Sequence, residues 1–427
     1  MKRIFVTILI CIAIISCTKP TAGSGTLQGW VYLKENENFP ISEVSVIYGD
    51  SAILTNKEGY FRYDSIPEGL QGITFKKDGY HTNLVQMNIT RESLNECSVE
   101  LEIAKCGWAV GNLDSYYGTI LRTTDQGKTW LRQGAPSLIP EVNMLNLCAL
   151  NDNECFVVGE PDTIHRKSTI LYTSNGGEEW QNIATSTIPL VSYGSVITKD
   201  GKNIFCASSD SCHIIYSTDK GKSWKSSLKS ENMKFYSAIT TYDGVNIWAC
   251  GMDKNGGAGI EYSPDGGTTW EFTHLGNTTS LQYATDIYAD MHGYIFVTVD
   301  SGGGLWTSDD KGETWSVSEA LSEGNSLYTI SLFDSSKMWI GGIEGTLHCT
   351  TDGKNFTNTF PGEEATSSIV RTVSFLRDGL NGAILVTNAS GLESSIYYTT
   401  NSGVEWNKSS IPYNFLMNSI DFVGGNN

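Results

Sequence analysis

Two short segments hold the side chains best suited to bind a ligand. The first contains Asp114, Tyr116 and Tyr117, and the second contains Glu160, Asp162, His165 and Arg166. Aromatic rings beside carboxylates suit stacking on a sugar together with hydrogen bonds to its hydroxyls, and they equally suit a hot spot for a protein partner. A solvated acidic loop without a ligand is the alternative interpretation of the same residues.

Six further polar residues stand at comparable positions: Asp210, His213, Asp253, Asp300, Glu344 and Glu393. If these loops surround a central channel, their carboxylates could attract a cation or, as a close pair, act on a glycosidic bond. The chain has no CxxC pair and no His–Cys spacing typical of a metal site. We therefore predict no catalytic residue, no metal and no cofactor, and we expect a binding surface here.

A repeated segment determines how these loops are positioned. Its pattern is Ser/Thr-x-Asp-x-Gly-x-Thr-Trp, as in TTDQGKTW at 123–130, and we call it the Asp motif. Seven copies are present, and their closing aromatic residues recur every 41 to 50 residues. The third and last residues of the copies are Asp125 and Trp130, Asn175 and Trp180, Asp219 and Trp224, Asp265 and Trp270, Asp310 and Trp315, Asp352 and Phe356, and Asn401 and Trp406.

The chemistry of the Asp motif is structural. An Asp side chain bonds nearby backbone N–H groups, Gly supplies a positive φ, and the closing Trp packs between sheets. Asn replaces Asp at 175 and 401. Asn makes the same backbone bonds, whereas a general acid or nucleophile would be lost. We therefore predict that these residues hold turns and do no catalysis.

Repeats of this length, each with short apolar strands, predict blades of a β-propeller. The fold class is thus all-β, with a ring of about seven blades and Asp-motif hairpins. Apolar strands such as 107–111 (GWAVG) and 155–159 (CFVVG) are interpreted as the inner strands. The first unit lacks the preceding strand, and Met417–Val423 matches it, so terminal strands are expected to pair and close the ring.

The first sixteen residues predict export. Lys2 and Arg3 precede an apolar run at 4–15 that is too short to cross a bilayer as a stable helix. Residues 14–17, Ile-Ile-Ser-Cys, resemble the lipobox of bacterial lipoproteins, which implies that Cys17 is acylated after residues 1–16 are removed. Residues 17–24 would be a lipidated tether to the outer membrane, facing either the periplasm or the surface. An ordinary signal peptide is the alternative.

Residues 25–103 read as short alternating strands and turns, which predicts a small β-sandwich of the prealbumin type. They resemble the carboxypeptidase regulatory-like family in Gly29-Trp30-Val31, in Val44 and Val46 after Pro40, and in the segments 55–61 and 75–80. The resemblance implies a non-catalytic spacer or docking domain. Residues 104–427 would then be the propeller.

Charge and cysteine content limit the partners and the compartment. Without Lys2 and Arg3 the chain has 27 basic and 47 acidic residues, a net charge of −20. Such a field repels phosphate backbones, which excludes nucleic acid as a partner. Eight cysteines remain after Cys11 and Cys17 are set aside. The pairs Cys148/Cys155 and Cys206/Cys212 flank predicted turns, so disulfides and free thiols are both possible.

The Asp motifs resemble those of Asp-box, or BNR-repeat, propellers. The photosystem II assembly-factor-like proteins of this group match best, because 107–111 followed by 118–130 corresponds to their pattern, which recurs over 105–423. The resemblance implies a non-enzymatic assembly factor. Sialidases carry an Arg-Ile-Pro motif that this chain lacks, xyloglucanases need two propellers, and sortilin-type receptors need ten blades.

These observations favour a non-catalytic lipoprotein of the cell envelope, with a propeller that binds an envelope protein or a glycan. The alternative hypothesis is a glycan-active hydrolase, sialidase-like or another glycosidase, that uses carboxylates of the loops.

Overall fold

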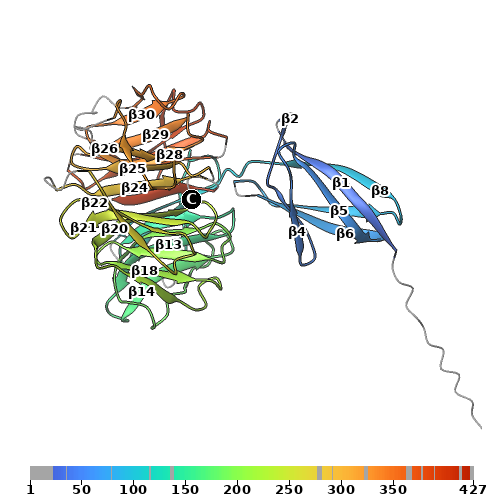
Figure 1. Cartoon of the computed structure of the whole chain (residues 1–427), viewed down its shortest axis with the longest axis horizontal. Coiled ribbons are helices and arrows are strands. Elements are labelled where there is room, and N and C mark those ends of the chain that lie inside the picture. Colours follow the sequence, from blue (N-terminus) through green and yellow to red (C-terminus); the bar gives the residue numbers. More distant parts are fainter. Residues whose placement is uncertain are drawn as a thin grey trace, which may run out of the picture. The chain divides into compact units, whose positions relative to one another are not determined.

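The computed structural model describes residues 23–34, 36–77, 79–114, 117–134, 139–276, 281–290, 292–321, 326–361, 368–376, 378–388, 390–412 and 416–423. These residues form β-strands and turns, and none of them belongs to a helix that could cross a membrane. They fall into two compact units, one ending with Thr82–Leu101 and one that comprises Lys77–His81 and the residues from Glu102 onward (Figure 1). The predicted signal peptide, Cys17 and most of the tether lie outside the described residues.

The first unit is a β-sandwich of two four-stranded sheets. One sheet contains β1 (Ser24–Leu33), β2 (Asn36–Pro40), β5 (Tyr60–Pro67) and β8 (Leu94–Leu101), and the other contains β3 (Ser45–Tyr48), β4 (Ser51–Leu54), β6 (Gly69–Lys76) and β7 (Asn83–Ile89). Alternate residues of β1 are buried, as expected for a strand with one face in a core. Phe61 and Phe75 meet edge to face with ring centroids 5.4 Å apart, so both sheets share that core.

The second unit is a β-propeller in which the described residues form seven four-stranded antiparallel sheets. From the innermost strand outward, sheet 1 contains β36 (Met417–Phe422), β9 (Gly107–Asp114), β10 (Tyr117–Thr123) and β11 (Leu131–Arg132). Sheet 2 contains β12 (Met144–Ala149), β13 (Cys155–Asp162), β14 (Lys167–Thr173) and β15 (Gln181–Asn182), and sheet 3 contains β16 (Tyr193–Thr198), β17 (Ile204–Ser208), β18 (His213–Ser217) and β19 (Lys225–Lys229).

The remaining four sheets repeat this order. Sheet 4 contains β20 (Met233–Thr241), β21 (Ile247–Asp253), β22 (Ala258–Ser263) and β23 (Glu271–Leu275), and sheet 5 contains β24 (Ala284–Ala289), β25 (Ile295–Val299), β26 (Gly304–Ser308) and β27 (Ser316–Val317). Sheet 6 contains β28 (Leu327–Leu332), β29 (Met338–Gly342), β30 (Leu347–Thr350) and β31 (Thr357–Asn358), and sheet 7 contains β32 (Ile369–Phe375), β33 (Gly382–Thr387), β34 (Ser394–Thr399) and β35 (Asn407–Lys408).

The last strand of the chain closes the ring. β36 pairs with β9 in an antiparallel register in which Ile420 faces Ala109. Innermost strands contact one another in chain order from β12 to β32, and β36 contacts both β32 and β12. The predicted pairing of the terminal strand with the first unit is therefore confirmed, and the ring has no open edge at the chain ends.

One expectation about strand order is wrong. The GWAVG-type strands β9 and β13 are second in their sheets, and the strand before each of them, or β36 in sheet 1, is innermost. Both strands are apolar because each is covered on two faces by neighbouring sheets. Hydrophobicity alone therefore does not tell them apart.

The Asp motifs fold as local turns. Asp125 Oδ1 accepts the N–H of Thr129 at 2.9 Å, and Oδ2 accepts the hydroxyl of Thr129 at 2.7 Å. Burial alone would raise the pKa of Asp125, but the hydrogen bonds from Thr129 outweigh it and lower the pKa. Asn175 and Asn401 accept the equivalent backbone bond at 3.0 and 2.9 Å.

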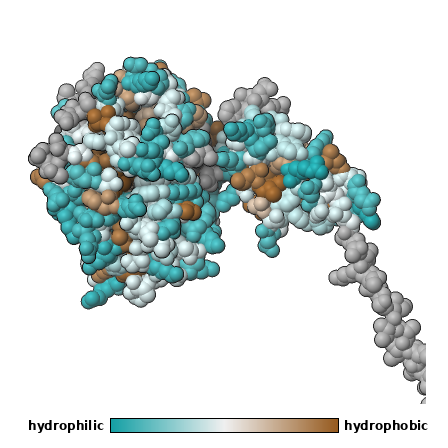
Figure 2. All heavy atoms as spheres, viewed as in Figure 1, coloured by the Kyte–Doolittle hydropathy of each residue, from teal (hydrophilic) through white to brown (hydrophobic). Residues whose placement is uncertain are grey.

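The closing aromatic residues fill the gaps between sheets. Trp130 is buried, lies with its ring centroid 6.2 Å from that of Phe422, and packs in one cluster with Leu385 of sheet 7. Its indole N–H donates to the carbonyl of Gly127 at 3.0 Å, so its polar atom is satisfied. Hydrophobic residues are scattered among hydrophilic ones on the visible surface of this unit (Figure 2).

Candidate functional site

Antiparallel pairing gives the propeller two different faces. In each sheet the innermost strand begins, the second strand ends and the third begins at one end, and we call this end the loop face. The Asp motif joins the third and fourth strands at the opposite end, which we call the Asp-motif face. Because corresponding strands of neighbouring sheets lie side by side, all seven sheets contribute to both faces.

The two predicted binding segments lie on the loop face, in the β9–β10 hairpin and the β13–β14 hairpin. Tyr116 and the side chain of Asp114 lie outside the described residues. Tyr117 is half-buried beneath the guanidinium of Arg132, which stands 4.2 Å from the centre of the ring. This cation–π contact uses part of the aromatic surface that was expected to face a ligand.

The second hairpin is fixed by its own polar groups. Asp162 accepts the backbone N–H of His165 at 2.9 Å, and its other oxygen lies 2.6 Å from His165 Nδ1. Burial alone would raise the pKa of Asp162, but the bonds from His165 lower it. Arg166 adopts a left-handed φ of 53° and is exposed, while Glu160 is half-buried.

A single asparagine links the two hairpins. Asn143 Oδ1 accepts the N–H of Leu113 at 2.8 Å, and the carbonyl of Asn143 accepts the N–H of Glu160 at 3.0 Å. The structure therefore places both predicted segments beside each other on one face. The sequence analysis did not identify Asn143, because its role depends on the packing of sheet 1 against sheet 2.

A second polar and aromatic group lies on the loop face of sheets 4 to 7. We call it the aromatic cluster and define it by Phe235, Tyr283, Asp300, Tyr328 and Arg371. The rings of Phe235 and Tyr283 meet edge to face with centroids 5.8 Å apart. The backbone N–H of Asp300 donates to the carbonyl of Tyr283 at 3.0 Å, and the hydroxyl of Tyr328 donates to Asp300 Oδ2 at 3.3 Å.

The electrostatics of the aromatic cluster keep its phenols protonated. Burial and the charge of Asp300 raise the pKa of Tyr328, and the charge of Arg371 only partly offsets them. Burial and Asp300 likewise raise the pKa of Tyr283. Arg371 is exposed, and its Nε donates to Thr387 Oγ1 at 3.1 Å. The cluster therefore offers phenol donors, a guanidinium and ring edges to a ligand.

Sequence reasoning identified only part of this cluster. Asp300 was among the loop carboxylates, but Phe235, Tyr283 and Tyr328 occupy the first positions of innermost strands or stand next to them, and they were assigned to cores. Two other loop carboxylates serve their own loops: Asp253 bonds His274 Nδ1 at 2.7 Å, and Asp210 accepts the N–H of Ser192 at 2.9 Å. Among the described residues, no group of three or more His, Cys, Asp or Glu could hold a metal ion.

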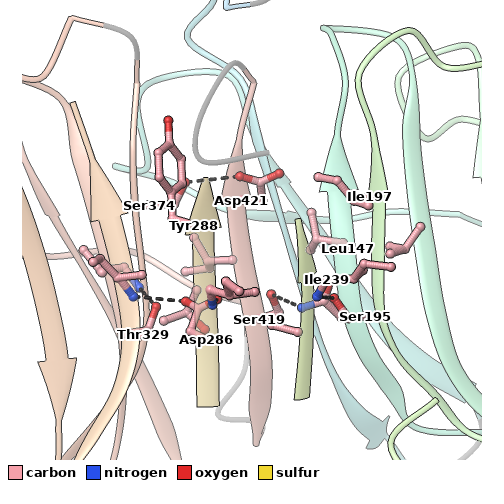
Figure 3. Close-up of a pocket in the computed structure, with 18 residues that line it drawn as sticks. Leu147, Ser195, Ile197, Ile239, Asp286, Tyr288, Thr329, Ser374, Ser419 and Asp421 are labelled. Carbon is pink, nitrogen blue, oxygen red and sulfur yellow. Dashed lines mark hydrogen bonds between the residues drawn. The ribbon is translucent and has the colours of Figure 1, made fainter. Parts of the chain in front are cut away.

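The innermost strands surround a polar cavity of about 90 Å³, which Figure 3 shows with Asp286 and Asp421 on different strands. Asp286 Oδ2 accepts the N–H of Ile330 at 3.0 Å, and Asp421 Oδ2 accepts the N–H of Ala149 at 2.8 Å. Each carboxylate thus joins its own sheet to the next one. Burial deep within the ring raises the pKa of Asp286 to about 6 against these hydrogen bonds.

The cysteines of the described residues are free thiols, including Cys148, Cys155, Cys206 and Cys212. Burial raises the pKa of Cys155 and of Cys206 well above the ordinary value. These side chains act as small core residues in the structure.

Comparison with known proteins identifies relatives of the propeller. Residues 80–244 match the family model described as photosynthesis system II assembly factor YCF48. The photosystem II assembly lipoprotein Ycf48 of Synechococcus sp. (strain CC9902) is 22% identical over 285 residues, which cover 63% of this chain and 75% of the relative.

Solved structures share the fold at low identity. The GH74 xyloglucanase from Xanthomonas campestris is 12% identical with a TM-score of 0.54, over 70% of this chain and 51% of that chain. The structure titled "YCF48 bound to D1 peptide" is 13% identical with a TM-score of 0.46, over 63% of this chain and 81% of that chain. The chain therefore carries a β-propeller whose sequence, over residues 80–244, is similar to the YCF48 family of photosystem II assembly factors.

Proposed function

We propose that this protein is a non-catalytic assembly lipoprotein whose propeller binds a protein partner on the loop face. The observation that carries the proposal is the aromatic cluster, in which two tyrosines, Asp300 and Arg371 meet at the ends of the innermost strands. Tyrosine and arginine are the side chains most enriched in the hot spots of protein interfaces. Their pre-arranged contacts lower the entropy lost on binding.

Similarity to an assembly lipoprotein supports the same proposal. The name of the Synechococcus relative describes a lipoprotein that acts in the assembly of a protein complex. We transfer the assembly role to this chain, but not the identity of the complex. The partner would be an envelope protein, and the hairpins with Tyr117, Glu160, Asp162, His165 and Arg166 would extend the binding surface toward sheets 1 and 2.

The remaining parts of the chain suit a membrane-anchored platform. We propose that Cys17 carries the lipid anchor in the outer membrane and that residues 25–103 form a spacer of the carboxypeptidase regulatory-like type. A glycan-active hydrolase receives less support, because both carboxylates of the central cavity are bonded to backbone N–H groups of the next sheet. They hold the ring rather than facing a substrate.

Photo-crosslinking in intact cells tests the proposal. A photoreactive phenylalanine analogue replaces Lys234, which is exposed beside Phe235 on the loop face. The matched control replaces Lys222, an exposed lysine in an Asp motif on the opposite face. We expect a discrete crosslinked envelope protein from position 234 and none from position 222. Crosslinks of equal strength from both positions would contradict a binding site on the loop face.

A further inference from the structure

The Asp-motif face contains a pocket between sheets 5 and 6 with a volume of about 430 Å³. This volume falls within the range of small-molecule sites. Its wall combines the aromatic rings of Tyr294, Phe296 and Trp315 with hydroxyl side chains, two carboxylates and Lys354. The pocket lies on the face opposite the aromatic cluster, so it does not depend on the proposed function.

A departure from the repeat pattern opens this pocket. In three sheets a tyrosine of the third strand stacks on an aromatic residue of the second: Tyr172 on Phe156, Tyr216 on Phe205 and Tyr262 on Trp248. In sheet 5 the corresponding residue is Thr307, which pairs with Phe296 across the strands. Without a tyrosine there, one side of Phe296 faces the pocket.

The neighbouring Asp motif departs from the pattern as well. The sixth copy, 350–356, is one residue shorter than the others and ends in Phe356 instead of Trp. Asp352 accordingly accepts the N–H of Asn355, three residues on, at 2.7 Å, whereas Asp125 accepts that of Thr129, four residues on. The shorter turn places Asp352, Gly353 and Lys354 along the pocket wall.

The chemistry of the wall matches a neutral, polyhydroxylated ligand. Tyr294 is 41% exposed and provides an aromatic surface, and hydroxyls of Thr314, Ser316 and Ser335 line the same space. Asp352 already accepts the N–H groups of Lys354 and Asn355, so its charge is largely satisfied. Asp309 and Lys354 then offset each other, which disfavours a strongly charged ligand.

We propose that this pocket binds one or two sugar units of a neutral glycan. An aromatic ring contacts the apolar face of a sugar, while hydroxyls and charged groups bond its hydroxyls in the plane of the ring. A surface site of this size binds with a Kd on the order of 1 mM for a disaccharide. Such a site would hold the protein against a glycan of the envelope while the loop face engages its partner.

Saturation-transfer NMR on the full chain tests this site. The probes are cellobiose, maltose, lactose and chitobiose, each at about 5 mM. The decisive variant is Thr307→Tyr, which restores the residue that the other sheets carry and fills the pocket. Thr268→Tyr is the matched control, because Thr268 is an exposed threonine in the Asp motif of sheet 4.

We expect saturation transfer to at least one sugar with the wild-type chain and with Thr268→Tyr, and a signal at least about tenfold weaker with Thr307→Tyr. The melting temperature of Thr307→Tyr shows whether this variant folds. If it does not, Tyr294→Ala replaces it, with the same expected loss. No transfer to any sugar from the wild-type chain, or equal transfer from the filled variant, would overturn the proposal.

Discussion

Tyr328 donates its hydroxyl to Asp300 across the boundary between sheets 5 and 6, with 3.3 Å between the two oxygens. Asp300 follows the second strand of sheet 5, and Tyr328 belongs to the innermost strand of sheet 6. A ring of repeats places such positions side by side, so a binding surface is assembled from single residues of several sheets. Function can therefore reside in positions that the repeat itself leaves variable.

The Asp motif should tolerate Asn and not Ala at position 125. Asp125→Ala removes both hydrogen bonds to Thr129 and is expected to lower the free energy of unfolding by about 1–2 kcal/mol. Asp125→Asn keeps the bond to the backbone N–H, as Asn175 does in the second copy, and should cost less than about 0.5 kcal/mol. Urea unfolding followed by tryptophan fluorescence measures both values. Equal losses for the two variants would contradict the structural role of this hydrogen bond.

Stability should depend on pH through Asp286. Its pKa is about 6 in the folded state, against an ordinary 3.8, so between these values the folded state holds more protons than the unfolded state. Stability is therefore highest below the ordinary pKa and falls as pH rises through about 6. Asp286 lines the cavity and is partly exposed to it, so we expect a loss of only about 1–2 kcal/mol.

Asp286→Asn should remove this dependence. Urea unfolding at several pH values between about 4 and 7 is expected to give a flatter profile for this variant than for the wild-type chain. Asp309→Asn, which changes an exposed carboxylate, serves as the control and should keep the wild-type slope. An unchanged slope in Asp286→Asn would show that another group titrates.

Ring closure should contribute strongly to stability. Phe422 is fully buried in β36 and packs against Trp130, so Phe422→Ala is expected to cost about 3–5 kcal/mol. Val404→Ala, at a position 79% exposed, is the control and should stay within about 0.5 kcal/mol of the wild-type chain. Thermal and urea unfolding measure both. A small effect at Phe422 would mean that the terminal strand adds little to the closed ring.

The repeat made the architecture predictable from the sequence. The spacing of the Asp motifs indicated the propeller, and the unmatched strand Met417–Val423 indicated how the ring closes. The order of strands within a sheet was not predictable, because β12 and β13 are both apolar and both covered on two faces. Distance from the ring axis depends on packing between sheets and leaves no separate pattern in either strand.

The candidate sites were predictable only where they lie in hairpins. Asp162 and His165 stand in a polar loop and attracted attention by composition. Tyr283 and Tyr328 are apolar in their sequence context and face the loop side only because of where their strands begin. The pocket beside Thr307 depends on a residue that is smaller than its counterparts, which becomes evident once the strands of all sheets are aligned.

Crosslinking from position 234 in a chain that carries Tyr328→Ala and Arg371→Ala tests the central claim most directly. The two changes remove a phenol and a guanidinium of the aromatic cluster and leave the cores between sheets in place. We predict that the crosslinked envelope protein seen with the unchanged cluster falls to about one tenth or less. Thr307→Tyr, on the opposite face, should leave the crosslink unchanged. A crosslink of full strength in the double variant would contradict a protein-binding site at the aromatic cluster.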